Sequence, residues 1–207
     1  MDRKVIILLG PPGCGKGSQA ARLSACLGIP AISTGEILRQ ECESGSALGQ
    51  AVEEILQSGQ LVSDGLMNQV VASRLGQFDC ANGCILDGYP RTAAQARFLD
   101  RLLRRLGMPS PVVLEFSLPA EEIVKRLSMR GRADDNRETI LERLRIHASN
   151  SAEVTAFYRT GTYHRVAATH SPARICEDLL RLLAKDWPGA LVAQAPKSWY
   201  SAANRNL

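Results

Sequence analysis

The stretch VIILLGPPGCGKGSQ, residues 5–19, joins an apolar run to a glycine-rich turn and then to the start of a helical pattern. The turn carries the complete G-x-x-x-x-G-K spacing, and the strand before it and the helix after it indicate a phosphate-binding loop. Glycines let backbone N–H groups point inward, and a helix N-terminus adds partial positive charge where phosphate oxygens would lie. We therefore expect nucleotide phosphates here, with Lys16 reaching the β- and γ-phosphates as a point charge.

The residues expected to surround the phosphates all belong to this loop and are Gly13, Cys14, Gly15, Lys16, Gly17 and Ser18. Cys14 is interpreted as a small spacer, because phosphoryl transfer needs positioning and charge neutralisation, to which a thiol adds little. Ser18 stands one place after the usual hydroxyl position, so its role toward Mg²⁺ is a weaker expectation than that of Lys16. A plain glycine- and proline-rich turn is the alternative, and the flanking strand and helix count against it.

Apolar, β-rich runs alternate with amphipathic helical stretches along the rest of the chain. Strands are expected at 4–9, 83–86, 112–116 and 165–168, and the helices after them at 16–27, 92–106, 120–129 and 172–185. Strands that alternate with helices of this length predict a parallel sheet with helices on both faces.

Two segments interrupt this alternation. Residues 33–62 have a helical pattern with no intervening strand, and Ser33 with Glu36 fits a capping box that opens the first helix. Asp135 and Glu138 form a similar start signal after a short arginine-rich connection over residues 127–135. The segment 188–207 lacks periodicity, and we expect a flexible tail there.

Composition limits the classes of function that fit. A chain of 207 residues with 45% hydrophobic residues suits one α/β domain with small insertions. The six cysteines are scattered without a CxxC unit, which favours reduced thiols and argues against a zinc site. A net charge of +4 and 5% aromatic residues do not support a nucleic-acid surface, although the surplus suits a polyanionic small molecule. No apolar run is long enough to span a bilayer and no signal peptide is evident, so we expect a cytoplasmic protein without a membrane anchor.

Two arginines follow places where the chain pattern changes. Arg39 lies in the helical segment after the sequence STGE, and Arg91 follows ILDGYP at the end of an expected strand. In an open parallel sheet, ligands collect beyond the carboxyl ends of the strands, where the phosphate loop and residues 87–91 would be neighbours. Guanidinium groups that converge there can neutralise a second anionic substrate and the charge of a phosphoryl group in transfer.

Five motifs, read in order, resemble those of adenylate kinases: GPPGCGKGSQ (10–19), ISTGEILR (32–39), GQLVSD (59–64), CILDGYPRTAAQ (84–95) and GRADDNRETILERL (131–144). The resemblance reaches to about Lys185. It implies a P-loop three-layer α/β/α fold with a five-stranded parallel sheet, in one kinase domain over residues 1–187. Within that domain it implies a core of 1–32, 63–126 and 136–187, a nucleoside monophosphate-binding insertion over 33–62 and a very short lid over 127–135. The implied reaction is Mg²⁺-dependent transfer from ATP to AMP, which gives two ADP, by a monomer.

The same resemblance implies three groups of site residues. The AMP site would be Thr34, Gly35, Arg39, Leu61, Val62, Gly88, Arg91, Gln95, Arg132 and Arg143. ATP would meet the loop residues together with Arg126, Arg130 and His170. The catalytic cations would be Lys16, Arg91, Arg126, Arg132 and Arg143.

Elementary chemistry agrees with these assignments. Arg39 and Arg91 can clamp the AMP phosphate bidentately, and Gln95 offers a donor and an acceptor to an adenine edge. Asp87, at a strand end beside the loop, suits Mg²⁺ held through water, with Ser18 as the second metal candidate. No protein nucleophile is required, because AMP already carries an ionised phosphate oxygen, and direct in-line transfer is expected.

Several positions depart from the family pattern. Glu36 stands where Asp is usual, Gln60 replaces a common Lys, and His170 stands where Gly often lets the backbone approach the donor adenine. Only Gly131 separates Arg130 from Arg132, which leaves no room for a zinc-binding or β-rich lid.

The sequence alone leaves two kinds of alternative open, purely structural roles for single residues and other functions for the whole protein. The arginines of 126–132 could be a solvated helix end, Arg39 and Arg91 could form surface ion pairs, and Gln95 could be an exposed helix residue. Another monophosphate kinase, such as a UMP/CMP kinase, is the nearest rival function, and Thr34 with Gln95 favours adenine. A non-catalytic nucleotide-binding regulatory protein is a rival of another class, and the joint presence of the lysine, Asp87 and the arginines argues against it.

Overall fold

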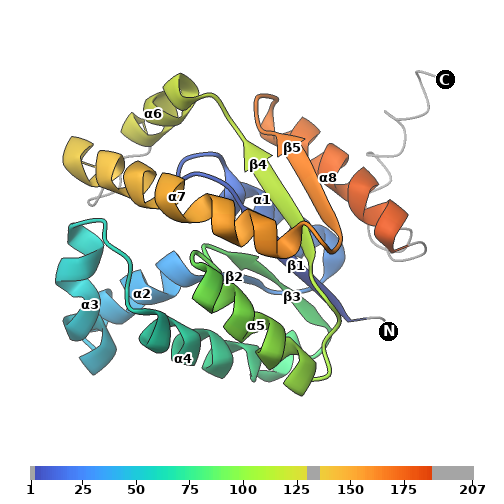
Figure 1. Ribbon diagram of the computed structural model, residues 1–207, viewed down its shortest axis with the longest axis horizontal. Helices are drawn as coiled ribbons and strands as arrows, with labels where there is room; N and C mark the ends of the chain where they lie inside the picture. Colours follow the sequence, from blue (N-terminus) through green and yellow to red (C-terminus); the bar gives the residue numbers. More distant parts are fainter. Residues whose placement is uncertain (1–2, 130–135, 188–207) are drawn as a thin grey trace.

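The protein is described by a computed structural model over residues 3–129 and 136–187, and its centre is a parallel sheet (Figure 1). The strands are β1 (Lys4–Leu9), β2 (Ala31–Ser33), β3 (Gly83–Asp87), β4 (Val112–Ser117) and β5 (Tyr163–Ala167). They pair in the order β2-β3-β1-β4-β5, and every pair is parallel. This confirms the expected five-stranded parallel sheet, with the short β2 added to the strands that the apolar runs predict.

Strand β1 is apolar on both sides because it lies in the middle of three layers. Val5 and Ile7 pack into one core, and Ile6 and Leu8, the alternate residues, pack into the other. The second core is shared with α1 (Lys16–Leu27) and α8 (Pro172–Asp186). Full burial of each such side chain contributes roughly 1.5–3 kcal/mol, which is why a continuous apolar run is required here.

The first core is covered by the remaining long helices. They are α2 (Thr34–Glu43), α3 (Ala47–Gln57), α4 (Asp64–Leu75), α5 (Ala93–Arg105) and α7 (Arg137–Tyr158). A short α6 (Ala120–Ser128) follows β4, and a 3₁₀ turn spans Phe78–Cys80. Within residues 3–129 and 136–187, no helix has the length and apolarity to cross a membrane.

Helices α2 and α3 form the expected helical insertion, which stands away from the sheet beside the N-terminal part of α7 (Figure 1). Their contact is very close, because a Cβ added to Gly49 on α3 would lie 2.1 Å from the carbonyl oxygen of Glu41. Only glycine permits the two helix backbones to approach this far.

Helix α2 begins directly after Ser33, as predicted, but the hydrogen bonds at its start are not those of a capping box, and the Asp135 of the second predicted box lies outside the described residues. The side chain of Ser33 makes no capping hydrogen bond to any residue that the structure describes, and the Glu36 carboxylate instead accepts from Arg39 Nη2 at 2.6 Å. Ser33 ends β2 in extended conformation, so pairing in the sheet sets its position. Helix α7 is capped by Asn136, whose Oδ1 accepts from the backbone N–H of Thr139 at 2.8 Å, and the helix begins one residue later than predicted.

Candidate active site

The glycine-rich loop after β1 curls around the Lys16 ammonium group. Gly10, Gly13 and Gly15 have φ angles of 134°, 82° and 97°, which L side chains rarely adopt. The curl aims the carbonyl groups of Gly10 and Pro11 at Lys16 Nζ, which donates to both at 2.8 Å. The lysine is therefore held at the mouth of a loop that ends at the N-terminus of α1, the arrangement that binds phosphate.

Helix α6 seals one side of the loop. A Cβ on Gly13 would lie 2.7 Å from Leu127 Cγ, so the last turn of α6 rests on the loop backbone. Arg126 precedes that leucine and donates from Nε to Glu122 at 3.0 Å. The predicted cation thus stands next to the loop on a helix in contact with it.

Asp87 lies where β3 ends, beside the start of α1. Its register partner on β1 is Leu8, two residues before the loop begins. A Cβ on Gly17 would be 3.4 Å from Asp87 Oδ2, so this carboxylate faces position 17, and the exposed Ser18 follows it on the helix. A carboxylate oxygen next to a phosphate loop is a suitable holder of Mg²⁺ through water.

A pocket opens between the helical insertion and the segment after β3. Most of the residues predicted to bind the monophosphate line it, namely Thr34, Gly35, Leu61, Val62, Gly88, Arg91 and Gln95. Leu38, Leu56, Gln60 and Met67 complete the lining, and the sequence analysis did not predict them as ligand contacts. The signal of the two leucines and the methionine was weak because apolar residues on helices read as ordinary core, and Gln60 was noted only as a departure from the family pattern.

The pocket floor is organised around the backbone of Gly88. Its carbonyl oxygen accepts from Thr34 Oγ1 at 3.0 Å and from Arg91 Nε at 2.7 Å. Its φ of 82° favours glycine, and a Cβ there would lie 2.9 Å from Thr34 Oγ1. Gly88 therefore joins the threonine of the insertion to the arginine of the core.

Three arginines converge beside this floor, as the sequence analysis expected. Desolvation lowers the pKa of Arg91, Asp87 opposes the shift, and the positive charges of Arg143 and then Arg39 lower it further. Arg91 is nonetheless exposed to solvent, because it lies in an open cleft, and water there weakens the effect of desolvation. Arg39 stands over Gly35, with Nη1 3.4 Å from where a Cβ of that glycine would lie. Positive groups gathered beside one pocket favour an anionic ligand.

Gln95 is not an exposed helix residue, since only 2% of its surface is accessible. Its Oε1 accepts from the backbone N–H of Arg91 at 2.7 Å, and its Nε2 donates to Asp64 Oδ1 at 2.8 Å. Thr92 caps α5 by accepting from the backbone N–H of Gln95 at 3.1 Å, which fixes the first turn of that helix. The side chain thus reaches the pocket wall with its amide already oriented.

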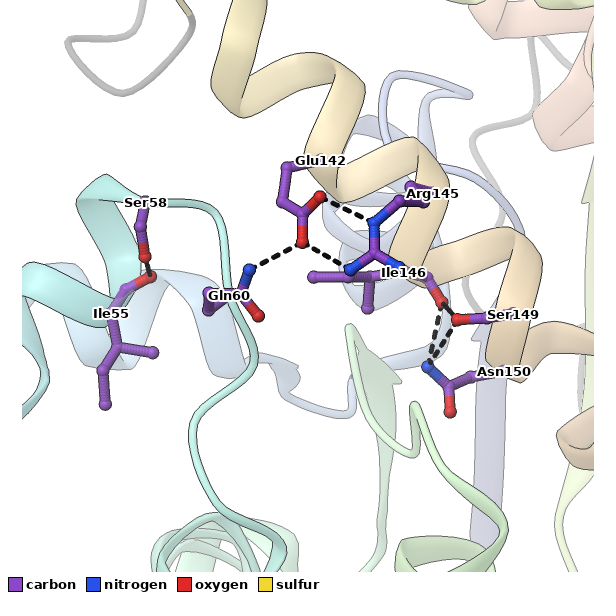
Figure 2. Close-up of polar contacts among 8 residues, drawn as sticks. All are labelled: Ile55, Ser58, Gln60, Glu142, Arg145, Ile146, Ser149 and Asn150. Carbon is purple, nitrogen blue, oxygen red and sulfur yellow. Dashed lines mark hydrogen bonds and ion pairs between the residues drawn. The ribbon is translucent and has the colours of Figure 1, made fainter.

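The insertion docks on α7 through polar contacts (Figure 2). Gln60 Nε2 donates to Glu142 Oε1 at 2.6 Å, while Arg145 clamps the same carboxylate with two bonds of 2.8 Å. The bonds from Arg145, and to a smaller extent the bond from Gln60, lower the pKa of Glu142 to about 2. Thr139 adds a bond from its hydroxyl to the carbonyl of Gln57 at 3.0 Å. Gln60, which stands where the family commonly has Lys, therefore places a neutral amide against the Glu142 carboxylate, which Arg145 already pairs.

His147 belongs to this cleft, and the sequence analysis assigned no role to it. It is half-buried on α7, one helical turn after Arg143. Burial lowers its pKa to about 4, and the charges of Lys16 and Arg91 add to the effect. The available signal was its i, i+4 spacing from a predicted site arginine, which puts both side chains on one face of the helix.

The start of α6 and the turn after β5 meet at one hollow. A shallow hollow at the start of α6 is lined by Pro119, Glu121, Glu122, Lys125 and Thr169. The exposed His170 follows the last of these residues, at the end of the turn after β5. Arg130, Arg132, Asp135 and most of the predicted lid, as well as the tail 188–207, lie outside the described residues.

Comparison with known proteins gives one consistent result. A family model described as adenylate kinase matches residues 8–163. The adenylate kinase of Xanthomonas campestris pv. campestris (strain 8004) is 43% identical over 87% of this chain and 99% of its own length. That of Mycolicibacterium paratuberculosis is 47% identical over 74% of this chain and 85% of its own length. The Mycobacterium bovis protein of the same name is 46% identical, with the same coverage of both chains.

Proposed function

The chain belongs to the adenylate kinase family of nucleoside monophosphate kinases, and from that premise we propose that it transfers the γ-phosphoryl group of Mg²⁺-ATP to AMP, which gives two ADP. The observation that carries the proposal is the position of the pocket of Thr34, Arg91 and Gln95. It opens at the carboxyl end of β3, beside the phosphate loop that follows β1. Two phosphate sites side by side are what direct transfer between two nucleotides needs.

Each group has a role in this scheme. Lys16 would neutralise the β- and γ-phosphates of the donor, and Arg126 would add charge from α6. Arg39 and Arg91 would hold the AMP phosphate, and Arg143 would lie between the two substrates, with Arg132 as a further cation. Because catalysis here is positioning and charge neutralisation, these residues suffice without a protein nucleophile.

Magnesium bound with ATP would neutralise charge on the phosphate oxygens. The residues present fit that ion, since Asp87 brings a carboxylate oxygen to the start of α1 and Ser18 offers a hydroxyl nearby in the chain. On the acceptor side, Gln95 would meet the adenine edge, while Leu61 and Val62 cover the base. His170 would stand next to the donor base, near the hollow at the start of α6.

The proposal extends to organisation and location. Residues 33–62 would be the monophosphate-binding insertion, 127–135 a minimal lid, and 1–32, 63–126 and 136–187 the core of one kinase domain. We propose a monomer that works in the cytoplasm on ATP, AMP and ADP, without nucleic-acid or membrane partners.

A coupled assay with ATP and a panel of AMP, CMP, UMP and GMP tests the acceptor. We expect AMP to have the highest kcat/KM, and a preference for CMP would replace this proposal with the pyrimidine alternative. Lys16→Met should lower kcat by about a hundredfold or more, because one preorganised charge on the transferring group is removed. Arg101→Ala, at an exposed position on α5, is the matched control and should keep full activity. Unchanged turnover in the lysine variant would favour a site used for binding alone.

A further inference from the structure

A hydrogen-bond chain in the wall of the AMP pocket leads from Gln95 to Asp64, a residue that has no role in the proposed transfer. Asp64 is the first residue of α4, and its two carboxylate oxygens both have partners. Oδ1 accepts from Gln95 Nε2 at 2.8 Å, and Oδ2 accepts from Thr92 Oγ1 at 2.9 Å. On the other side of the amide, Gln95 Oε1 accepts from the backbone N–H of Arg91 at 2.7 Å.

The two neighbours of the Gln95 amide have opposite and fixed hydrogen-bonding character. An ionised carboxylate only accepts, and a backbone N–H only donates. The amide nitrogen must therefore face Asp64, and the amide oxygen must face Arg91. The reversed orientation would set oxygen against oxygen and N–H against N–H, and both buried bonds would be lost.

These bonds use only half of the hydrogen-bonding capacity of the Gln95 amide. An amide nitrogen has two hydrogens and an amide oxygen accepts twice, so one donor and one acceptor stay available, each at a fixed place. A 6-aminopurine offers an acceptor at N1 and a donor at N6, whereas a 6-oxopurine offers a donor at N1 and an acceptor at O6. An amide that can turn over suits both kinds of base, and an amide held in one orientation suits one.

We propose that Asp64 is a specificity-determining positioning residue, which holds the Gln95 amide in the orientation that accepts a 6-aminopurine monophosphate and rejects a 6-oxopurine monophosphate. This inference rests on the proposed function, because it needs the acceptor base to meet Gln95. Asp64 acts through Gln95 and does not itself have to touch the base. Thr92 supports it by fixing the second carboxylate oxygen and the first turn of α5.

The test compares AMP with IMP as acceptors in wild type and in Asp64→Asn. The substitution preserves size but allows the side chain to donate, so a reversed Gln95 amide would again find a partner. The ratio of kcat/KM for AMP to that for IMP should fall by about tenfold, as expected for the loss of one charge-assisted hydrogen bond. Loss of structure at the pocket would lower both values together and leave the ratio unchanged, which would overturn the inference.

Two further variants keep the result interpretable. Ser63→Ala removes the N-cap of the same helix, whose hydroxyl accepts from the N–H of Leu66, without touching Gln95, and its ratio should match wild type. If Asp64→Asn does not fold, Thr92→Val serves as the test instead. It must lower the AMP-to-IMP ratio, because Asp64 Oδ2 then loses its hydrogen bond from Thr92. A wild-type enzyme that does not use AMP would refute the proposed function itself. A wild-type enzyme that uses AMP, with an unchanged ratio in the folded variants, would refute the role of Asp64 alone.

Discussion

His147 should make the stability of this protein depend on pH in a way that a single substitution removes. The ring is half-buried on α7, and the positive charges of Lys16 and Arg91 act on it. Burial is the main cause that lowers its pKa from 6.5 to about 4, the two cations lower it further, and Glu115 opposes them. The perturbation is His147→Gln, which keeps a polar side chain of similar length and removes the titration.

The direction of this pH dependence follows from whether the folded or the unfolded state binds more protons. Below about pH 6.5 the unfolded chain binds a proton at His147, while the folded protein does not bind it until the pH nears about 4. The free energy of unfolding therefore falls as the pH falls through this window. At about 1.4 kcal/mol per pH unit, the full window is worth up to roughly 3 kcal/mol, and the part down to about pH 5 roughly 2 kcal/mol.

Urea unfolding of wild type and His147→Gln, at neutral pH and at about pH 5, measures the effect. The variant should lose about 2 kcal/mol less than wild type between the two conditions, because all other groups titrate alike in both proteins. Ala152→Gln, which puts the same side chain at an exposed position of α7 and removes no titrating group, is the control and should behave as wild type does. Equal losses in His147→Gln and wild type would refute the reasoning.

Three other substitutions test separate parts of the structure. Gly88→Ala places a Cβ 2.9 Å from Thr34 Oγ1 at a φ of 82°, so steady-state kinetics should show KM for AMP raised by at least about tenfold. Gln60→Ala removes the 2.6 Å bond to Glu142, and we expect kcat/KM for AMP to fall about threefold to tenfold with little change in thermal stability. An unchanged kcat/KM would mean that this contact does not hold the insertion. Leu99→Ala, at a fully buried position of α5, should lower the free energy of unfolding by roughly 2–5 kcal/mol in urea titrations while KM for AMP stays the same.

Much of the fold and part of the site follow from the sequence because they depend on residues close together in the chain. The apolar run of residues 5–9, the glycine spacing of the loop and the helix after it are local patterns, and the structure has β1 and α1 within the expected bounds. The neighbouring positions of Arg39 and Arg91 also follow, since parallel strands bring their carboxyl ends to one edge, whereas Arg143 on α7 was expected only from the family resemblance. The residue roles at this edge stay predictions until the variants are measured.

The capping box at Ser33 failed for the opposite reason, because the local pattern lost to a contact made elsewhere in the chain. Ser33 is held by strand pairing with Asp87, and no local rule reveals that partner. The sequence also allowed Gln95 to be an exposed helix residue, and the bond to Asp64 that excludes this spans 31 positions.

The sequence by itself therefore determined the phosphate loop, the alternation of strands and helices, and the family to which the chain belongs. Only the tertiary structure decided which groups complete the pocket: the carboxylate that orients Gln95, the bond of Gln60 to Glu142 across 82 positions, and the place of His147 among the cations. The physical reason is that backbone geometry and periodicity depend on neighbours in the chain. A hydrogen-bond partner or a pKa depends on neighbours in space, which the path of the whole chain brings together.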